Sequence, residues 1–155
     1  MLAVSQPCHC FQVNVVGIGE QKAPRILETE SGFAAFFLSS QAYQWYGNLD
    51  LYMRLYDAQG APLGLDLPVV QDVGQYDVSM LAGGGFVLAY VPYSASDSVW
   101  GQIVSEAGAK VGTAFSILFN PFANKTWDTP GFQYWYLGQT PPAVVGLCDG
   151  TFAAA

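Results

Sequence analysis

Short apolar runs separated by Gly, Pro, Asn or Asp recur along the whole chain. They are rich in Val, Phe, Tyr, Leu and Trp, the residue types that fit the pleated surface of a strand. No long stretch has the three-and-four apolar spacing of an amphipathic helix with capping residues at its ends. The pattern predicts an all-β chain of about ten to twelve strands. The runs are FQVNVV, GFAAFFLSS, LDLYMRLYD, LGLDLPVV, YDVSML, GFVLAYVP, VWGQIVS, KVGTAFSIL, GFQYWYLG and AVVGLC.

The run LYMRLYD shows the alternation of a strand, in which successive side chains point to opposite faces. Leucine and methionine fall on one face, and tyrosine and arginine fall on the other. The two sets are Leu51, Met53 and Leu55 against Tyr52, Arg54 and Tyr56. Because both sets are large, we expect both faces of this strand to be covered.

The chain contains the same hairpin pattern twice. Residues 51–64 (LYMRLYDAQGAPLG) align without a gap on residues 99–112 (VWGQIVSEAGAKVG), which places Gly60 on Gly108. Each segment reads as a strand, a glycine-containing turn and a second strand, and the two glycines are available for the positive φ of a tight turn. We therefore expect two equivalent β-hairpins.

A Gly-Phe pair opens an apolar strand three times, at Gly32, Gly85 and Gly131, with separations of 53 and 46 residues. Recurrence at roughly 20 to 50 residues is typical of repeat architectures. The third copy ends soon after AVVGLCDG, so we expect it to lack a closing strand. The N-terminal strand FQVNVV would supply that strand by pairing antiparallel with residues 143–148, in its own chain or in an adjoining copy.

The sequence thus predicts a single domain built from three repeats of antiparallel strands. The repeats occupy approximately residues 18–70, 71–118, and 119–150 together with 11–17.

These motifs resemble the tandem repeats of large bacterial surface and adhesin-like proteins, whose unit has the form FQVN, a spacer, GGFVVTW and VYGQRFDADGNPVG. Here FQVN stands at residues 11–14, GGGFVLAY at 83–90 and the hairpin pattern at 99–112. The resemblance covers most of the chain and implies propeller-blade-like sheets with no catalytic residues attached. The acids of the family's RFDADG turn survive only in part, because Ser105 stands where the first copy has Asp57. A calcium-binding role for this turn is therefore not expected to carry over.

Three blades do not close a propeller, which needs about four or more. A chain of three such units is expected to form a larger ring with other copies, in which the N-terminal strand completes a neighbour's blade. The alternative is a chain that closes on itself as a pseudo-threefold β-trefoil or β-prism. We favour blade-like sheets in an oligomer.

Composition and charge exclude several classes of protein. The 155 residues suit one domain. The composition, 52% hydrophobic and 11% charged, is unlike that of a disordered tail. The net charge of −7 repels phosphate backbones and anionic lipids, so neither nucleic acid nor a membrane is an expected partner. The start MLAVSQPCHCF lacks the basic and long apolar regions of a signal peptide, so we expect synthesis without one.

The cysteines and the single histidine offer a weak candidate for a metal site. Cys8, His9 and Cys10 are consecutive, and the expected pairing of chain start and chain end would bring Cys148 near them. These are ligands that suit zinc. In a strand, however, His9 points away from the two thiols. Free thiols are the favoured interpretation, a disulfide from Cys148 to one of the pair comes next, and no metal or cofactor is expected.

The usual catalytic signatures are missing from the sequence: it has no nucleophile elbow, phosphate loop or HExxH motif. The glycines at 83–85 precede a strand and are predicted to form a turn. Paired acids could hydrolyse glycosides, but acids near turns are more often solvated loop residues, so an enzyme is not expected. The acid pairs are Glu28 with Glu30 and Asp50 with Asp66.

Aromatic residues lie in or near the loops that follow the Gly-Phe strands. Beside Gln, Asn, Ser and Asp they suit sugar stacking and protein interfaces alike, and ordinary packing between repeats is the third alternative. The candidate binding residues are Tyr43, Trp45, Tyr46, Tyr93, Trp135 and Tyr136.

Together these features predict a non-catalytic structural or adhesive β-repeat protein that acts in an oligomeric assembly. Low charge, many aromatics, no recognisable export signal and the adhesin-like repeat favour a virion component, such as a capsid decoration or tail protein of a bacterial virus. Its place would be the virion or an extracellular assembly, and its partners further copies or other virion or surface proteins. The alternatives are a soluble carbohydrate-binding lectin that binds glycans and, second, a glycoside hydrolase.

Overall fold

The computed structural model describes residues 13–14, 19–40, 49–95, 98–119 and 141–154. These residues form ten strands and no helix, which confirms the all-β prediction. The strands are β1 (Gln21–Thr29), β2 (Gly32–Ser39), β3 (Asp50–Asp57), β4 (Leu67–Val70), β5 (Val73–Met80), β6 (Phe86–Pro92), β7 (Ser98–Val104), β8 (Lys110–Phe119), β9 (Val144–Gly146) and β10 (Phe152–Ala154).

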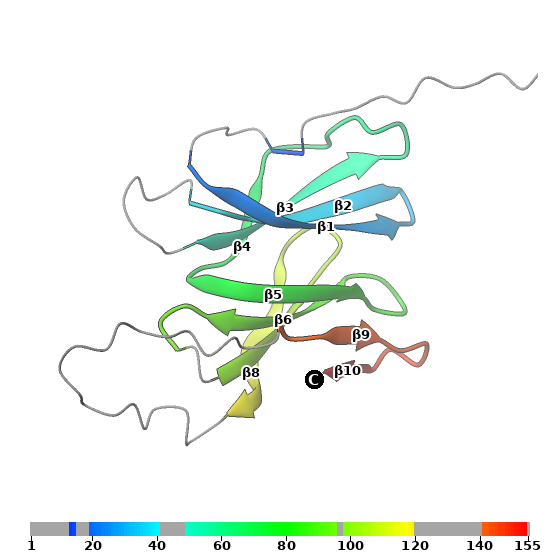
Figure 1. Cartoon of the computed structure of the whole chain (residues 1–155). Coiled ribbons are helices and arrows are strands. Elements are labelled where there is room, and N and C mark those ends of the chain that lie inside the picture. Colours follow the sequence, from blue (N-terminus) through cyan, green and yellow to red (C-terminus); the bar gives the residue numbers. More distant parts are fainter. Residues whose placement is uncertain (1–12, 15–18, 41–48, 96–97, 120–140, 155) are drawn as a thin grey trace, which may run out of the picture.

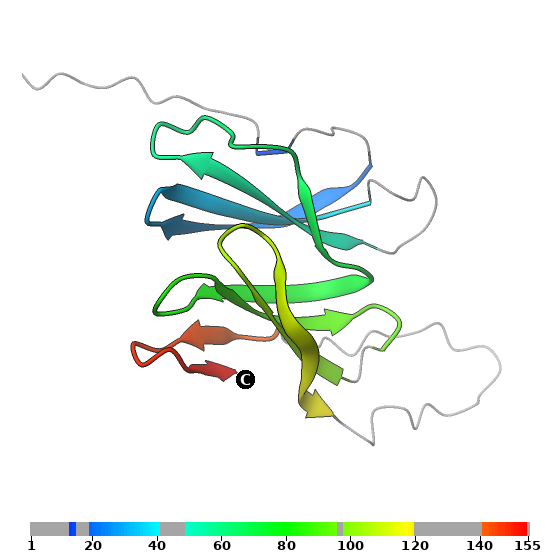
Figure 2. The same ribbon diagram turned by 180° about the vertical axis from the view of Figure 1, so that it is seen from behind.

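The strands are arranged in three layers. The first sheet has the order β1-β2-β3-β4, the second has the order β5-β6-β7-β8, and β9 pairs with β10 in a separate hairpin. All of these pairs are antiparallel. Figure 1 shows the first sheet at the top, the second sheet in the middle and the hairpin below, and Figure 2 shows the same three layers from behind.

The main core lies between the first and second sheets. One face of β2 and β3 packs against one face of β5 and β6, and the rings of Phe36 and Phe86 meet edge to face with centroids 5.1 Å apart. Several of its side chains are completely buried: Phe36, Met53, Val73, Phe86, Leu88 and Val104.

A second, smaller core lies between the second sheet and the hairpin. Val87 and Ala89 point away from the first sheet and pack with Val144 of β9. Phe152 of β10 packs against the same cluster, and its ring lies 5.6 Å from that of Phe115. Both faces of β6 are therefore buried, which is why its sequence is a continuous apolar run.

Three hairpins share one turn geometry. In the first, the amide of Asp57 donates to the carbonyl of Ala61 and the amide of Gly60 donates to Asp57. The turns at 105–109 and 147–151 have the same two hydrogen bonds at the same positions, and the glycines have φ of 84°, 84° and 83°. The flanking residues also pair in the same register, namely Tyr56 with Pro62, Val104 with Lys110, and Gly146 with Phe152. The two predicted turns are therefore equivalent, but the strands after them are not. Only an isolated bridge at Pro62 follows the first turn and β4 begins at Leu67, whereas β8 begins at Lys110, directly after the second turn.

The Gly-Phe pairs have a steric reason. A Cβ at Gly32 would lie 2.1 Å from the carbonyl oxygen of Tyr56, and a Cβ at Gly85 would lie 2.7 Å from that of Val104. Tyr56 and Val104 are the residues immediately before the two equivalent turns. Glycine at these positions therefore lets the second strand of each sheet approach the third.

The predicted runs that the structure describes all contain strands, from β2 to β9. GFQYWYLG and all of FQVNVV except Val13 and Asn14 lie outside the described residues. Two strands, β1 and β10, were not predicted. Residues 143–148 do not lack a partner strand, because β10 pairs with β9. The expected pairing of the N-terminal segment with residues 143–148 is wrong within this chain, because Val13 and Asn14 lie in no strand and Val13 is bound by Tyr56 of the first sheet.

Gly85→Ala should destabilise the protein by more than about 1 kcal/mol, because Gly85 has φ of 81° and its Cβ would meet backbone. Gly64→Ala is the matched control, since nothing lies within 4 Å of its Cβ. Urea unfolding of both variants measures the difference. Equal stabilities would contradict the steric role of Gly85.

Candidate functional site

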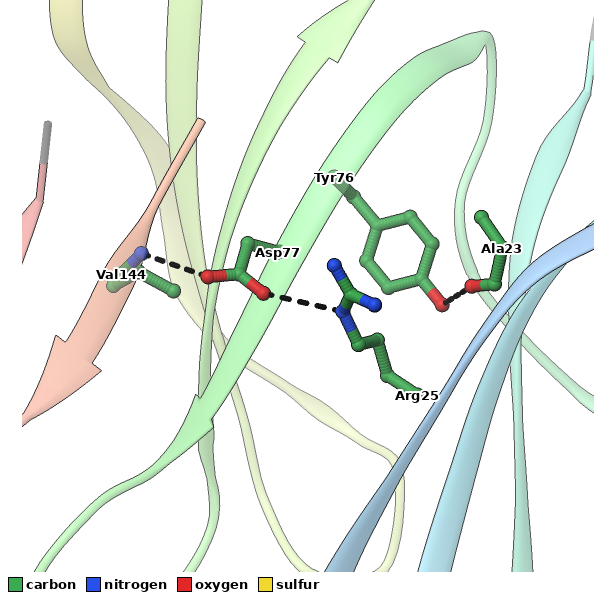
Figure 3. Close-up of polar contacts among 5 residues, drawn as sticks. All are labelled: Ala23, Arg25, Tyr76, Asp77 and Val144. Carbon is green, nitrogen blue, oxygen red and sulfur yellow. Dashed lines mark hydrogen bonds and ion pairs between the residues drawn. The ribbon is translucent and has the colours of Figure 1, made fainter. Parts of the chain in front are cut away.

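Strand β5 lies at the edge of the second sheet, and its side chains connect all three layers. Figure 3 shows two neighbours on this strand, Tyr76 and Asp77. The Tyr76 hydroxyl donates to the carbonyl of Ala23 in β1 over 2.6 Å. The Asp77 carboxylate lies 3.4 Å from Nε of Arg25 in β1 and accepts a 3.0 Å hydrogen bond from the amide of Val144 in β9. We call these five residues the interlayer junction.

The irregular part of β1 makes the junction possible. The pairing of β1 with β2 shifts register between Lys22 and Arg25, where Ala23 has φ of 54° and Pro24 carries no N–H. In this bulge the carbonyl of Ala23 turns to the Tyr76 hydroxyl.

Two side chains of β5 accept hydrogen bonds from β9, at the edge of β9 that faces away from β10. Asp77 accepts from the amide of Val144, and Ser79 accepts from the amide of Gly146 over 2.9 Å. Both pairs have a spacing of two residues, so alternate side chains of one strand match alternate amides of the other. These amides point away from β10, so no further strand can use them for pairing.

Burial sets the ionisation state of the junction's phenol. Desolvation raises the pKa of Tyr76 well above its ordinary value, and the nearby Arg25 opposes this only in part. Burial likewise raises the pKa of Tyr56 and of Tyr90. All three hydroxyls therefore stay protonated near neutral pH.

A second polar network holds the strand ends beside the predicted aromatic loops. Asp72, which has φ of 58°, lies between β4 and β5. Its amide donates to the Asp50 carboxylate over 3.0 Å, and its carbonyl accepts from the amide of Tyr93 over 2.9 Å. Its side chain accepts from the amide and the hydroxyl of Ser94. The network holds the loop backbone at Tyr93, whose side chain is 44% exposed.

Tyr93 is the candidate binding residue that the structure describes. The other five, Tyr43, Trp45, Tyr46, Trp135 and Tyr136, lie outside the described residues. Whether these aromatics share a surface therefore stays a prediction.

Of the candidate metal ligands, too, the structure describes only one. Cys8, His9 and Cys10 lie outside the described residues, whereas Cys148 is an exposed free thiol in the turn after β9. Within the part of the chain that the structure describes, no three His, Cys, Asp or Glu side chains form a group that would hold a metal ion.

The predicted acid pairs have structural partners or exposed positions. Asp50 is buried and accepts from the Asp72 amide. Asp66 lies 3.7 Å from Nη1 of Arg54. Glu28 and Glu30 are exposed on β1 and in the turn after it. Glu30 also lines an open hollow of about 400 Å³ together with Glu106 and the glycines 83–85, which form the predicted turn between β5 and β6.

The outer face of the first sheet carries a cluster that was not among the predicted site residues. The ring of Tyr56 stacks on that of Phe33 with centroids 4.7 Å apart, and the Arg54 guanidinium lies 5.6 Å from the Tyr56 ring. The Tyr56 hydroxyl donates to the carbonyl of Val13 over 2.5 Å. Tyr52, Arg54 and Tyr56 are all buried, which confirms that this face is covered.

Comparison with protein-family models, curated proteins and solved structures finds no match to this chain. No helix among the described residues is long and apolar enough to cross a membrane.

Asp77→Ala should lower the free energy of unfolding by about 1 to 3 kcal/mol, because it leaves the buried Val144 amide without its acceptor. Arg25→Ala should cost only about 0 to 1 kcal/mol, because the Arg25 side chain is 54% exposed. Denaturant unfolding gives both values, and hydrogen exchange should show faster exchange at Val144 in the first variant alone. Equal effects in the two variants would argue against Asp77 as the link to β9.

Stability should fall as the pH rises above about 10. The folded-state pKa of Tyr76 lies above its unfolded value, so the unfolded chain releases this proton first. The contribution is complete below the unfolded value and is lost as the pH rises towards the folded one. Tyr76→Phe should flatten the decline by up to about 1.4 kcal/mol per pH unit. Urea unfolding between pH 9 and 12 tests this, and an unchanged slope in Tyr76→Phe would contradict it.

Proposed function

We propose that this chain is a structural or adhesive β-sheet protein that acts in an oligomeric assembly. In this proposal each copy is a short stack of propeller-blade-like sheets, and other copies extend the stack. The observation that carries the proposal is the hairpin of β9 and β10. It repeats the turn and register of the hairpins in the two larger sheets, yet β10 has 3 residues where β8 has 10.

The strand arrangement supports the blade-like alternative over a trefoil or prism. Propeller blades are four-stranded antiparallel sheets. The first two sheets have this strand number, run in chain order, and pack face to face. The hairpin packs on the far face of the second sheet as the third and fourth strands of a further blade would.

The position of Val13 supports completion by a neighbouring copy. Tyr56 holds this residue at the outer face of the first sheet, whereas the hairpin lies on the far side of the second sheet. Packed sheets lie about 10 Å apart, so the two ends of the stack are about two such spacings from one another. Val13 is therefore placed to meet the hairpin of another copy stacked on the first sheet, and not the hairpin of its own chain.

The location in a virion or an extracellular assembly, as a capsid decoration or tail protein of a bacterial virus, rests on the sequence features alone. A lectin is the second candidate, and the observation that favours it is the exposed side chain of Tyr93 on a loop held by Asp72.

Native mass spectrometry and sedimentation should show masses that are multiples of the 16.7 kDa chain and that grow with concentration. The physical reason is that a two-stranded hairpin is a marginal sheet unless further strands complete it. A strict monomer at every concentration would contradict the assembly. A monomer that binds glycans and loses binding on Tyr93→Ala would favour the lectin instead.

A further inference from the structure

Two carboxylates lie together where the chain passes from the first sheet to the second. Asp50 begins β3, and Asp72 lies in the link between β4 and β5. The Asp50 carboxylate accepts a 3.0 Å hydrogen bond from the Asp72 amide. The Asp72 side chain turns to the loop after β6, where one of its oxygens accepts from the amide and the hydroxyl of Ser94.

Neither carboxylate has a positively charged partner among the described residues. Asp50 is only 5% exposed, and Oδ1 of Asp72 is buried and accepts no hydrogen bond from the described part of the chain. The ion pairs of the described residues join Lys22, Arg25 and Arg54 to other acids. Buried charges in proteins are normally paired or coordinate a metal ion, so the charge of these two carboxylates needs a partner.

A buried hydroxyl at the end of β2 lies beside the same acids. Ser39 is the strand partner of Asp50, so the two side chains lie on the same face of the first sheet. Ser39 is 1% exposed, and its Oγ has no hydrogen-bond partner in the segments that the structure describes. A buried hydroxyl without a partner costs free energy. Ser39, Asp50 and Asp72 thus follow one another across β2, β3 and the link after β4.

We infer that Ser39, Asp50 and Asp72 form a calcium site. Calcium takes about six to eight oxygen ligands in a flexible geometry, and water supplies those that the protein does not. The protein supplies the Asp50 carboxylate, Oδ1 of Asp72 and Oγ of Ser39. Magnesium fits this irregular set less well, because it demands a near-ideal octahedron. The site has two acids and a hydroxyl, which distinguishes it from the groups of three His, Cys, Asp or Glu that the described residues lack.

A water molecule alone would not meet the requirements of this site. Water can form hydrogen bonds with Oγ of Ser39 and Oδ1 of Asp72, but it carries no charge. A divalent cation contacts the same oxygens and balances the charge of the two carboxylates. Because only two carboxylates contribute, we expect weak binding, with a dissociation constant of about 10⁻⁴ to 10⁻³ M.

The ion would join three parts of the fold. Asp50 belongs to the first sheet, Asp72 to the link between the two large sheets, and Ser94, which donates to Asp72, to the loop that carries Tyr93. Calcium that binds the folded chain and not the unfolded one stabilises the fold. The inference goes beyond the proposed function, because it holds for a single copy as well as for an assembly.

Thermal unfolding with calcium chloride tests the site. After metal ions have been removed with EDTA, about 5 mM calcium should raise the Tm by about 3 °C or more. Sodium chloride at the same ionic strength is the reference, because the net charge of −7 makes the chain sensitive to any salt. Magnesium at the same concentration should have a smaller effect. Isothermal titration calorimetry should show one calcium ion per chain.

Three variants locate the ion. Asp50→Asn removes a charge but keeps an oxygen for the Asp72 amide, and it should weaken calcium binding at least about tenfold. Ser39→Ala should reduce the calcium-dependent shift yet leave the Tm in EDTA unchanged or higher, because it removes a hydroxyl without a partner. Asp57→Asn is the matched control, since its carboxylate lies at the other end of β3 and accepts from two amides of the following turn. It should bind calcium as the unaltered protein does.

The site is wrong if calcium raises the Tm no more than sodium chloride does, or if Asp50→Asn binds calcium as tightly as Asp57→Asn. A larger effect of magnesium than of calcium also overturns it. So does a clear fall in the Tm of Ser39→Ala in EDTA, because the hydroxyl would then have a stabilising role without an ion. None of these results depends on self-association, so the proposed function is tested separately.

Discussion

The architecture depends on one constraint, which is that both faces of the second sheet are apolar and must be covered. Along β6, Phe86 and Leu88 point to the first sheet, while Val87 and Ala89 point to the hairpin, and all four are completely buried. Burying one large apolar side chain contributes roughly 1.5 to 3 kcal/mol. A single sheet with two such faces is unstable alone, so it needs a layer on each side.

Apolar packing is not directional, so it does not by itself fix how the layers are placed on one another. The hydrogen bonds and the ion pair of the interlayer junction fix the position of the layers relative to one another. Tyr76 and Asp77 are adjacent on an edge strand, and between them they contact the first sheet on one side and β9 on the other. Leaving a buried donor or acceptor unpaired costs about 1 to 3 kcal/mol. A layer that slid along its neighbour would pay that cost at several of these groups together.

The sequence predicted the strands whose side chains form the core. It missed β1 and β10, which have no regular hydrophobic pattern. The runs of β2, β3 and β6 are apolar because they are buried. Gly60 and Gly108 mark equivalent turns because both have positive φ. Strand β1 escaped prediction because Pro24 and its bulge break the alternation at an exposed edge. Strand β10 escaped because three residues are too few to show a period.

The candidate site was harder to predict than the fold. Tyr93 is an exposed loop aromatic, as expected. The sequence did not predict that the carbonyl of Asp72, a residue with positive φ, would accept a hydrogen bond from the Tyr93 amide. Asp77 is a lone acid in an apolar run, and its two partners lie 52 and 67 residues away in the chain. A contact of that kind leaves no local pattern, because neither partner is a neighbour in sequence.

The structure also explains why the two ends of the stack are unequal. Asp77 and Ser79 accept hydrogen bonds from the amides of β9 that point away from β10, so no strand can pair with β9 through these amides. On the outer face of the first sheet, the Tyr56 hydroxyl donates to the carbonyl of Val13, a residue that precedes β1 in the same chain. The two ends of the stack therefore differ, because one carries a two-stranded hairpin and the other carries Val13 on the outer face of the first sheet.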